Sequence, residues 1–287
     1  MRFKMKLSDK NMAQAIKAIC KLTFALVISA TNVQAAKADI VKIGGTGAAM
    51  GTMKELGQAF VELHRTHRVV VVPSLGSGGG IKALQSGALQ LAVSGRDLNL
   101  DEKASGLTAV RYGTSPFVFV TYKDVPTLAL TKAMIADLYS GKQQNWSNGR
   151  PVRLVMRPKK EGDTILVQKI SPAIDSAVKT ALERPGMVVA ITDTDSADQV
   201  EKFPNSFGTS TLALLLSERR QLTVLPLEGV SPSVPAMENG SYPYAKEMYA
   251  ILPRNPSPAT RQFMDFVQSA AGRDILRRLG HKTYFPK

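Results

Sequence analysis

Short β-rich runs alternate with segments of helical period in the first third of the chain. Residues 40–43 are rich in β-branched side chains, and a glycine turn at 44–47 follows them. From residue 52 to residue 64 apolar side chains recur at spacings of three and four, which predicts a helix with one buried face. The next run, 69–72, consists of four valines, which is typical of a strand buried on both faces.

The same alternation predicts the fold class. A short helix is predicted at 81–86, where Gly87 ends it, and another strand at 89–93. The resulting order, β-α-β-α-β, favours an α/β sheet with right-handed crossover connections.

Beyond residue 100 strands and helices continue to alternate, with two irregular interruptions. Pro116 divides one apolar stretch into two predicted strands, 108–112 and 117–122. Later strands are predicted at 151–156, 187–192, 222–225 and 247–252, and helices at 131–139, 165–170, 171–182, 258–269 and 273–279. Segments without a clear period near 123–130 and 240–246 indicate two α/β lobes, with the C-terminus returning to the first lobe.

Two glycine-rich turns follow the first two predicted strands. Thr46 lies among glycines at 44–47, and Ser77 lies in a similar turn at 75–80. A helix N-terminus presents unpaired backbone N–H groups and a partial positive charge, and glycines let a ligand approach the backbone. With the hydroxyl of Thr46 added, the first turn is predicted to be an anion seat.

Asp97 follows the third predicted strand. Because ligands of open α/β sheets bind at the carboxyl ends of the strands, Thr46, Ser77 and Asp97 are expected to converge on one place. Taken alone, Asp97 is equally well explained as an N-cap or turn residue.

Residues 1–35 have the features of a secretory signal peptide. Lys and Arg are frequent in 1–21, an apolar core follows at 22–30, and small residues precede a cleavage site after Ala35. The apolar core is too short to span a bilayer, which takes about 20 residues. An amphipathic N-terminal helix is the alternative. Cys20 lies inside this segment, so we expect a mature chain without disulfides, in the periplasm or secreted.

The charge balance narrows the range of partners. The chain carries 37 Lys and Arg against 23 Asp and Glu, a net charge of +14. Residues 1–36 hold six of the basic and one of the acidic residues, which leaves 31 basic and 22 acidic residues, or +9, in the mature chain. A basic balance is compatible with nucleic acid, a membrane surface or small anions. Because the basic residues are scattered and aromatics make up only 6%, no nucleic-acid partner is expected.

Signatures of enzymes are weak, so no catalytic residue and no cofactor are predicted. The mature chain has no thiol nucleophile, and the dinucleotide fingerprint fails at Met50, where it needs a glycine. His64 and His67 have a spacing that could hold a metal, but a solvated helix terminus explains them better, and no metal site is predicted.

Five short motifs occur in a fixed order: GGTGA, GSGGGI, SGRD, a loop with Arg157 before a helix, and GSYPYAKEMYAIL. In order and spacing they resemble the phosphate-binding proteins of bacterial ABC transporters and their wider class, the type II periplasmic solute-binding proteins. The resemblance runs from about Asp39 to the C-terminus. It implies a two-lobed α/β fold with a ligand cleft between the lobes, lobe I formed by 36–123 and 245–287 and lobe II by 124–244.

The resemblance also implies a phosphate held by hydrogen bonds from both lobes. From the first turn, Thr46 and the backbone N–H groups of Gly47 and Ala48 would bind its oxygens. From the second turn, Ser77 and Gly78 would do the same.

The remaining implied contacts come from an aspartate and from the second lobe. Asp97 would accept a hydrogen bond from the proton-bearing oxygen of phosphate, which selects against sulfate. Arg157 would supply a charge-assisted pair, together with Gly162 and Thr164 of the same loop.

This second-lobe loop departs from the family pattern. The family has Ser-Gly-Thr where this chain has Glu161, Gly162 and Asp163. Carboxylates repel a phosphate dianion, and desolvation in a closed cleft strengthens the repulsion. Lys159 and Lys160 could compensate, or Thr164 could shift into the place of the missing hydroxyl. Alternatively, the site has a different ligand or none.

Two functions follow from the resemblance and from this departure. The first is a monomeric periplasmic solute-binding protein that captures phosphate or a related oxyanion and delivers it to a membrane ABC permease. The alternative is a binding-protein-like sensor or interaction module with an altered ligand site. Stabilisation by an anion separates the two, since only an intact site predicts it.

Overall fold

We describe the fold from a computed structural model of the chain, which describes residues 39–125 and 128–285. The predicted signal peptide, residues 1–35, and its Cys20 lie outside the described residues. Among the described residues, no helix is both long and apolar enough to cross a membrane.

The first part of the sheet has the predicted β-α-β-α-β order. β1 (Asp39–Gly45) pairs in parallel with β2 (His67–Val71) on one side and with β3 (Leu91–Ser94) on the other. The connections carry the short 3-10 helix η1 (Gly47–Ala49), α2 (Met50–Leu63) and α3 (Gly76–Gln85). α3 therefore begins five residues earlier than predicted, and the glycines of the second turn form its first turn.

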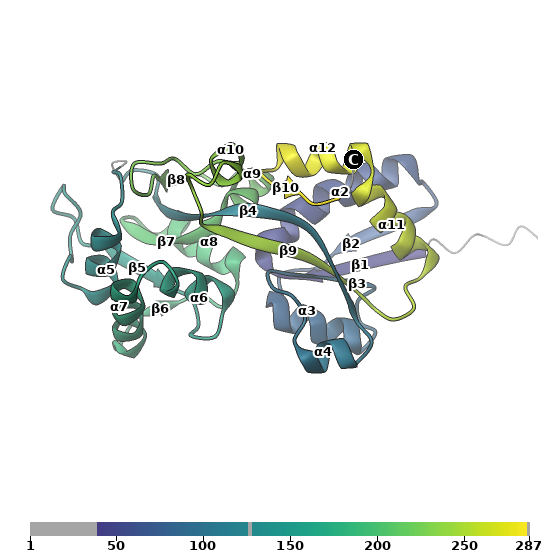
Figure 1. Ribbon diagram of the computed structural model, residues 1–287, viewed down its shortest axis with the longest axis horizontal. Helices are drawn as coiled ribbons and strands as arrows, with labels where there is room; N and C mark the ends of the chain where they lie inside the picture. Colours follow the sequence, from purple (N-terminus) through teal and green to yellow (C-terminus); the bar gives the residue numbers. More distant parts are fainter. Residues whose placement is uncertain (1–38, 126–127, 286–287) are drawn as a thin grey trace, which may run out of the picture. The chain divides into compact units, whose positions relative to one another are not determined.

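β4 (Thr108–Tyr122) is one strand of 15 residues, so the prediction of two strands separated by Pro116 is wrong. From 108 to 116 it pairs antiparallel with β9 (Ala245–Leu252). From 117 to 122 it pairs instead with β7 (Ser206–Thr211) and β8 (Leu222–Leu225). Pro116 is tolerated because it lies where the strand changes partners, although it has no N–H to donate. Figure 1 shows β4 and β9 side by side along the middle of the molecule.

The second part of the sheet is built around β7. Short parallel pairings join β7 to β5 (Arg153–Met156) and β5 to β6 (Val188–Val189). The helices of this part are α5 (Lys132–Ser140), α6 (Gly162–Gln168), α7 (Pro172–Glu183), α8 (Asp193–Lys202), α9 (Leu212–Glu218) and α10 (Val234–Glu238). The hydrophobic core of this part contains several aromatic side chains. The Phe207 ring packs against Phe119, Tyr139 and Trp146.

The C-terminal helices lie against the first part of the sheet. α11 (Pro258–Gln268) contacts β1 and α2, and α12 (Ala270–Arg278) contacts α2, as Figure 1 shows. A short α4 (Leu100–Ala104) and β10 (Lys282–Thr283), which pairs with β4, complete the elements. The first part of the sheet and the part around β7 each have a buried hydrophobic cluster of their own, as expected for two lobes. The residue boundaries given above for the lobes stay a prediction.

Candidate functional site

The first glycine turn is locked in place by the backbone of its neighbours. Gly45 has φ 142°, and a Cβ there would lie 1.9 Å from the carbonyl oxygen of Val93, so only glycine fits. The N–H of Thr46 donates to this same carbonyl at 2.9 Å, and Leu75 N donates to Gly45 O at 3.0 Å. The turn that holds Thr46 is thereby fixed against β3 and against the start of α3.

The start of α8 lies directly over this turn. Thr46 Oγ1 donates to Asp193 Oδ2 at 2.8 Å, and both side chains are buried. A Cβ on Gly47 would lie 2.6 Å from the backbone nitrogen of Thr194, so the two segments touch backbone to backbone. The predicted anion seat at the first turn is therefore covered by a carboxylate of this chain.

Four charged side chains meet behind Thr46. Lys246 Nζ donates to Asp193 Oδ1 and, at 2.5 Å, to Asp163 Oδ1. Arg157 Nε lies 3.7 Å from Asp163 Oδ2, and Arg157 Nη2 lies 3.9 Å from Asp193 Oδ2. We call Arg157, Asp163, Asp193 and Lys246 the charge cluster. It contains two cations and two carboxylates, all buried, so its formal charge is balanced.

Burial and neighbouring charges act on the pKa values of the cluster in opposite directions. Burial tends to raise the pKa of Asp193, but the adjacent Lys246 and Arg157 outweigh it and hold that pKa well below its usual range. Burial raises the pKa of Asp163, and the Asp193 carboxylate adds to this effect. Burial tends to lower the pKa of Lys246, but the two carboxylates hold it above its usual value. Of the two carboxyl groups, Asp193 is therefore the one whose pKa the cations lower.

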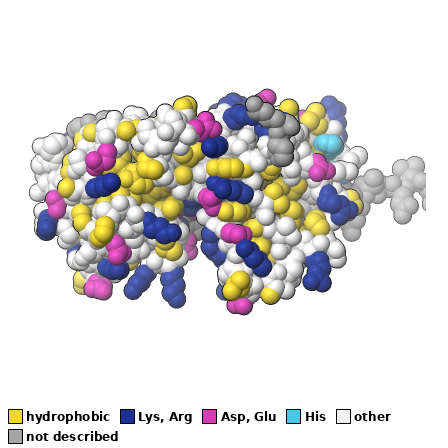
Figure 2. Space-filling view, viewed as in Figure 1, with side chains coloured by type: hydrophobic (Ala, Val, Ile, Leu, Met, Phe, Trp, Pro, Cys, Tyr) yellow, Lys and Arg dark blue, Asp and Glu magenta, His cyan; other side chains and the backbone are white. Residues whose placement is uncertain are grey.

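A cavity of about 190 Å³ opens beside the cluster, and we call it the inner cavity. Its lining is drawn from both parts of the sheet and consists of Thr46, Ser77, Gly78, Gly95, Arg96, Lys160, Glu161, Gly162 and Lys246. It adjoins a larger groove of about 580 Å³, the outer groove, which shares Arg96, Lys160 and Lys246 with it. Figure 2 shows basic and acidic side chains mixed along the middle of the face that it presents.

The structure brings three of the six predicted residues of the first lobe to the inner cavity. Thr46, Ser77 and Gly78 line the inner cavity, while Gly47 and Ala48 are buried under α8. Ser77 Oγ accepts a hydrogen bond from Gly95 N at 3.0 Å. Asp97 lies apart from them, because it is exposed, pairs with Lys103 Nζ at 2.9 Å and lines the outer groove. The roles assigned to these residues stay predictions.

Of the residues in the second-lobe loop, some line the inner cavity and others lie behind it. Gly162 lines the inner cavity, as does Glu161, whose side chain is 39% exposed. Arg157 lies deeper, where its Nη1 donates to Ala190 O at 2.6 Å. Thr164 Oγ1 donates to Arg157 O at 3.1 Å, so it supports the loop from behind. Neither of these two side chains reaches the cavity wall in this arrangement.

Sequence reasoning missed Asp193 and Lys246. Asp193 follows a predicted strand, so the rule that selected Thr46, Ser77 and Asp97 also applied to it. The predicted strand 187–192 shrinks to the two residues of β6, and the chain then turns at Thr192 into α8. Lys246 lies within one of the quoted motifs, but it falls in the irregular segment 240–246, one residue before the predicted strand 247–252. Its position there gave no signal of an inward side chain, although the observed β9 includes it.

The close contact at Gly47 leads to a first prediction. Gly47→Ala is expected to destabilise the protein by about 1–3 kcal/mol. The added methyl group meets the backbone nitrogen of Thr194 at 2.6 Å, which cannot move aside as a side chain could, and the hydroxyl of the same residue at 2.7 Å. Urea unfolding monitored by tryptophan fluorescence measures this. Gly78→Ala is the matched control, because no atom lies within 4 Å of a Cβ at that position. Equal losses in both variants would contradict the prediction.

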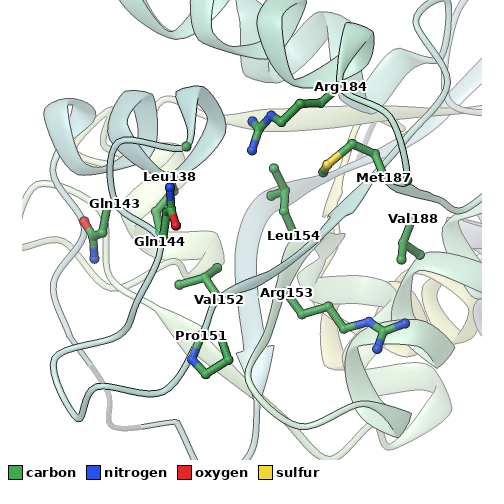
Figure 3. A pocket seen from close by; sticks show the side chains of 12 residues that line it. Leu138, Gln143, Gln144, Pro151, Val152, Arg153, Leu154, Arg184, Met187 and Val188 are labelled. Atoms are coloured by element: carbon green, nitrogen blue, oxygen red, sulfur yellow. The ribbon is translucent and has the colours of Figure 1, made fainter.

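Another hollow, of about 450 Å³, lies entirely in the part of the chain around β5. Figure 3 shows Arg184, Met187 and Leu154 around it, with Gln143 and Gln144 on the facing loop. Arg184 Nη2 donates to the carbonyl oxygen of Tyr139, so its charge is engaged locally. None of the predicted ligand residues lines this hollow. The inner cavity is therefore the better candidate for a ligand site.

Comparisons with known proteins agree on the family. A family model described as the PBP superfamily domain matches residues 30–271. The phosphate-binding protein PstS of Borreliella burgdorferi is 22% identical over 280 residues, covering 94% of this chain and 98% of the relative. PstS of Bacillus subtilis is 23% identical over 239 residues, covering 79% and 74%. A crystal structure from Clostridium perfringens, described as a phosphate ABC transporter substrate-binding protein with bound phosphate, covers 86% of this chain and 100% of its own. It is 22% identical, with a TM-score of 0.73.

Proposed function

Since the chain belongs to the PBP superfamily, we propose that it is a solute-binding protein that captures phosphate or a related oxyanion in the inner cavity. The protein has the two-lobed fold of this class and is a binding protein rather than an enzyme. The relatives named as phosphate-binding proteins support the choice of ligand.

One observation carries the proposal, which is the set of groups that line the inner cavity. Thr46, the first turn of α3 at Ser77 and Gly78, Lys160 and Lys246 line one small space, and Glu161 is the acidic residue in the same lining. A helix N-terminus and lysines both favour a compact anion, and hydroxyl groups donate to its oxygens. Arg96 also lines the cavity, although its guanidinium is paired with Glu102 at 2.7 Å.

The residues that line the inner cavity come from both parts of the sheet, and this suggests how ligand binding could close the two lobes. An anion that contacts Thr46 and Ser77 on one side and Gly162 on the other joins the two lobes and favours the closed arrangement. We propose that the protein works outside the cytoplasmic membrane as a monomer and releases its ligand on docking to an ABC permease.

A second candidate function rests on the charge cluster. The cations Arg157 and Lys246 are already paired with Asp163 and Asp193, so the charge cluster is balanced before any ligand enters. A sensor or interaction module that no longer binds an anion would have this property.

A panel of anions tests the main proposal. We would unfold residues 36–287 thermally, at constant ionic strength, with phosphate, arsenate, sulfate, phosphonate, molybdate or small carboxylates. A ligand that binds only the folded state at one hundred times its dissociation constant adds about 2.7 kcal/mol of stability. A rise of the midpoint with phosphate or a related oxyanion supports the proposal. No rise with any anion would favour the sensor or interaction module.

The hydroxyl of Thr46 supplies a second prediction. Thr46→Val keeps the shape and removes the donor, so we expect phosphate affinity to fall about tenfold to a hundredfold, the usual loss for a hydrogen bond to a charged group. Isothermal titration calorimetry measures this. Thr180→Val, at an exposed position of α7, is the matched control. An unchanged phosphate affinity in Thr46→Val would show that the hydroxyl of the first turn does not bind the ligand.

A further inference from the structure

We infer that Asp193 is an internal ligand of the anion site, whose carboxylate fills the seat and must be displaced before an external anion can occupy it. The inference rests on the proposed function in one respect only, which is that the external ligand is an anion.

The contacts of Asp193 are those expected of a bound anion. Its Oδ2 accepts from Thr46 Oγ1 at 2.8 Å and lies 3.9 Å from Arg157 Nη2, and its Oδ1 accepts from Lys246 Nζ. These three partners are a hydroxyl, a guanidinium and an ammonium. Two of them, Thr46 and Lys246, also line the inner cavity. An anion in the cavity would therefore compete with Asp193 for the same side chains.

Local helix capping does not explain the position of the Asp193 side chain. α8 is capped by Thr192, whose hydroxyl accepts from Asp195 N at 3.1 Å, while Asp195 Oδ2 accepts from Thr192 N at 2.9 Å. This reciprocal pair already satisfies the helix start. Asp193, the next residue, is directed instead across to Thr46, which is 147 positions earlier in the chain.

Displacement of Asp193 would also give an anion in the inner cavity access to the guanidinium of Arg157. Arg157 lies behind Asp193, and its Nε has no hydrogen-bond partner among the described residues. With both carboxylates in place the charge cluster is balanced, so a further buried anion would be uncompensated. With Asp193 moved away, the buried cluster of Arg157, Lys246 and Asp163 has an excess positive charge. The Glu161 carboxylate, whose side chain is 39% exposed, lies 3.8 Å from Arg157 Nη2 and offsets part of that charge. Because Lys246 and Arg157 keep the Asp193 carboxyl ionised, it competes as an anion over the neutral pH range.

Chemical rescue tests the internal ligand without reference to phosphate. Asp193→Ala empties the seat, so formate should bind there as a replacement carboxylate. Compared with chloride at equal ionic strength, formate is expected to raise the thermal midpoint of Asp193→Ala by about 3 °C or more, with saturation. The wild-type protein and Asp265→Ala, which removes an exposed carboxylate on α11, should show no saturable rise. A rise that is equal in all three proteins, or absent from Asp193→Ala, would overturn the inference.

Asp193→Asn provides an independent measurement if the alanine variant does not fold. The amide keeps the size and an oxygen acceptor for Thr46 but removes the competing charge. Calorimetry is expected to show phosphate binding at least about tenfold tighter than in the wild type, while Asp265→Asn binds as the wild type does. Unchanged or weaker binding in Asp193→Asn would overturn the inference. If no oxyanion binds the wild type but formate rescues Asp193→Ala, the proposed function fails and the internal ligand stands.

Discussion

Lys246→Met is expected to lower the free energy of unfolding by about 3–5 kcal/mol, the usual cost of removing one partner from a buried ion pair. Lys246 is 5% exposed and contacts both Asp163 and Asp193. Without its ammonium group, the two buried carboxylates keep Arg157, at 3.7–3.9 Å, as their neighbouring cation among the described residues. Urea unfolding at pH 7 measures the loss.

A matched control and a double variant separate the charge from the packing. Lys82→Met makes the same change at an exposed position of α3 and is expected to stay within about 0.5 kcal/mol of the wild type. Combining Lys246→Met with Asp193→Asn removes one uncompensated carboxylate and is expected to recover part of the stability. A double variant whose loss equals the sum of the two single losses would show that the carboxylates and Lys246 are not coupled.

Periodicity predicted the elements that bury a regular apolar face. α2 buries Met53, Leu56 and Phe60 of the predicted stripe, whereas its fourth member, Leu63 at the end of the helix, is 67% exposed. α8 gave no such signal, because the residues it buries are Asp193, Ser196, Ala197 and Val200, which are mostly small or polar. Helix α8 then went unpredicted, and with it the carboxylate that covers the first turn.

The rule that ligands gather at strand ends predicted backbone positions better than side-chain directions. It placed Thr46 and Ser77 at one cavity, where both are found. It placed Asp97 there too, but this side chain pairs with Lys103, six residues further along the chain. The direction of an exposed carboxylate depends on such local partners, and strand order carries no information about them. Resemblance to a family likewise located the Arg157 loop without showing that Arg157 lies behind two carboxylates.

Stability is expected to decrease as the pH falls from 6.5 to 4, because His281 is buried as a neutral ring. Its side chain is fully buried, and its Nε2 lies 3.1 Å from Thr52 Oγ1. Its Nδ1 has no hydrogen-bond partner among the described residues, and its ring centroid lies 5.8 Å from that of the buried Tyr112. Burial lowers the pKa of His281 to about 4 from its ordinary value near 6.5.

The sign follows from which state binds the proton. Above pH 6.5 His281 is neutral in the folded and the unfolded chain, so its full contribution to stability is present. Between pH 6.5 and 4 the unfolded chain takes up a proton that the folded chain does not, which favours unfolding by up to about 3 kcal/mol. Other groups titrate over the same range, so the wild type must be compared with a variant that lacks only this proton site.

His281→Gln is that variant, since its amide stays neutral and retains a polar atom near Thr52. The variant is expected to be less stable than the wild type at pH 7, because the ring also packs against Tyr112 and Gly113. The difference between the two free energies of unfolding, measured in urea at half-unit steps, should shift in favour of the variant by about 3 kcal/mol between pH 7 and pH 4. Parallel pH profiles would mean that His281 is protonated equally in both states. The depressed pKa would then be wrong, and the acid sensitivity of the fold would have to come from carboxylates such as those of the charge cluster.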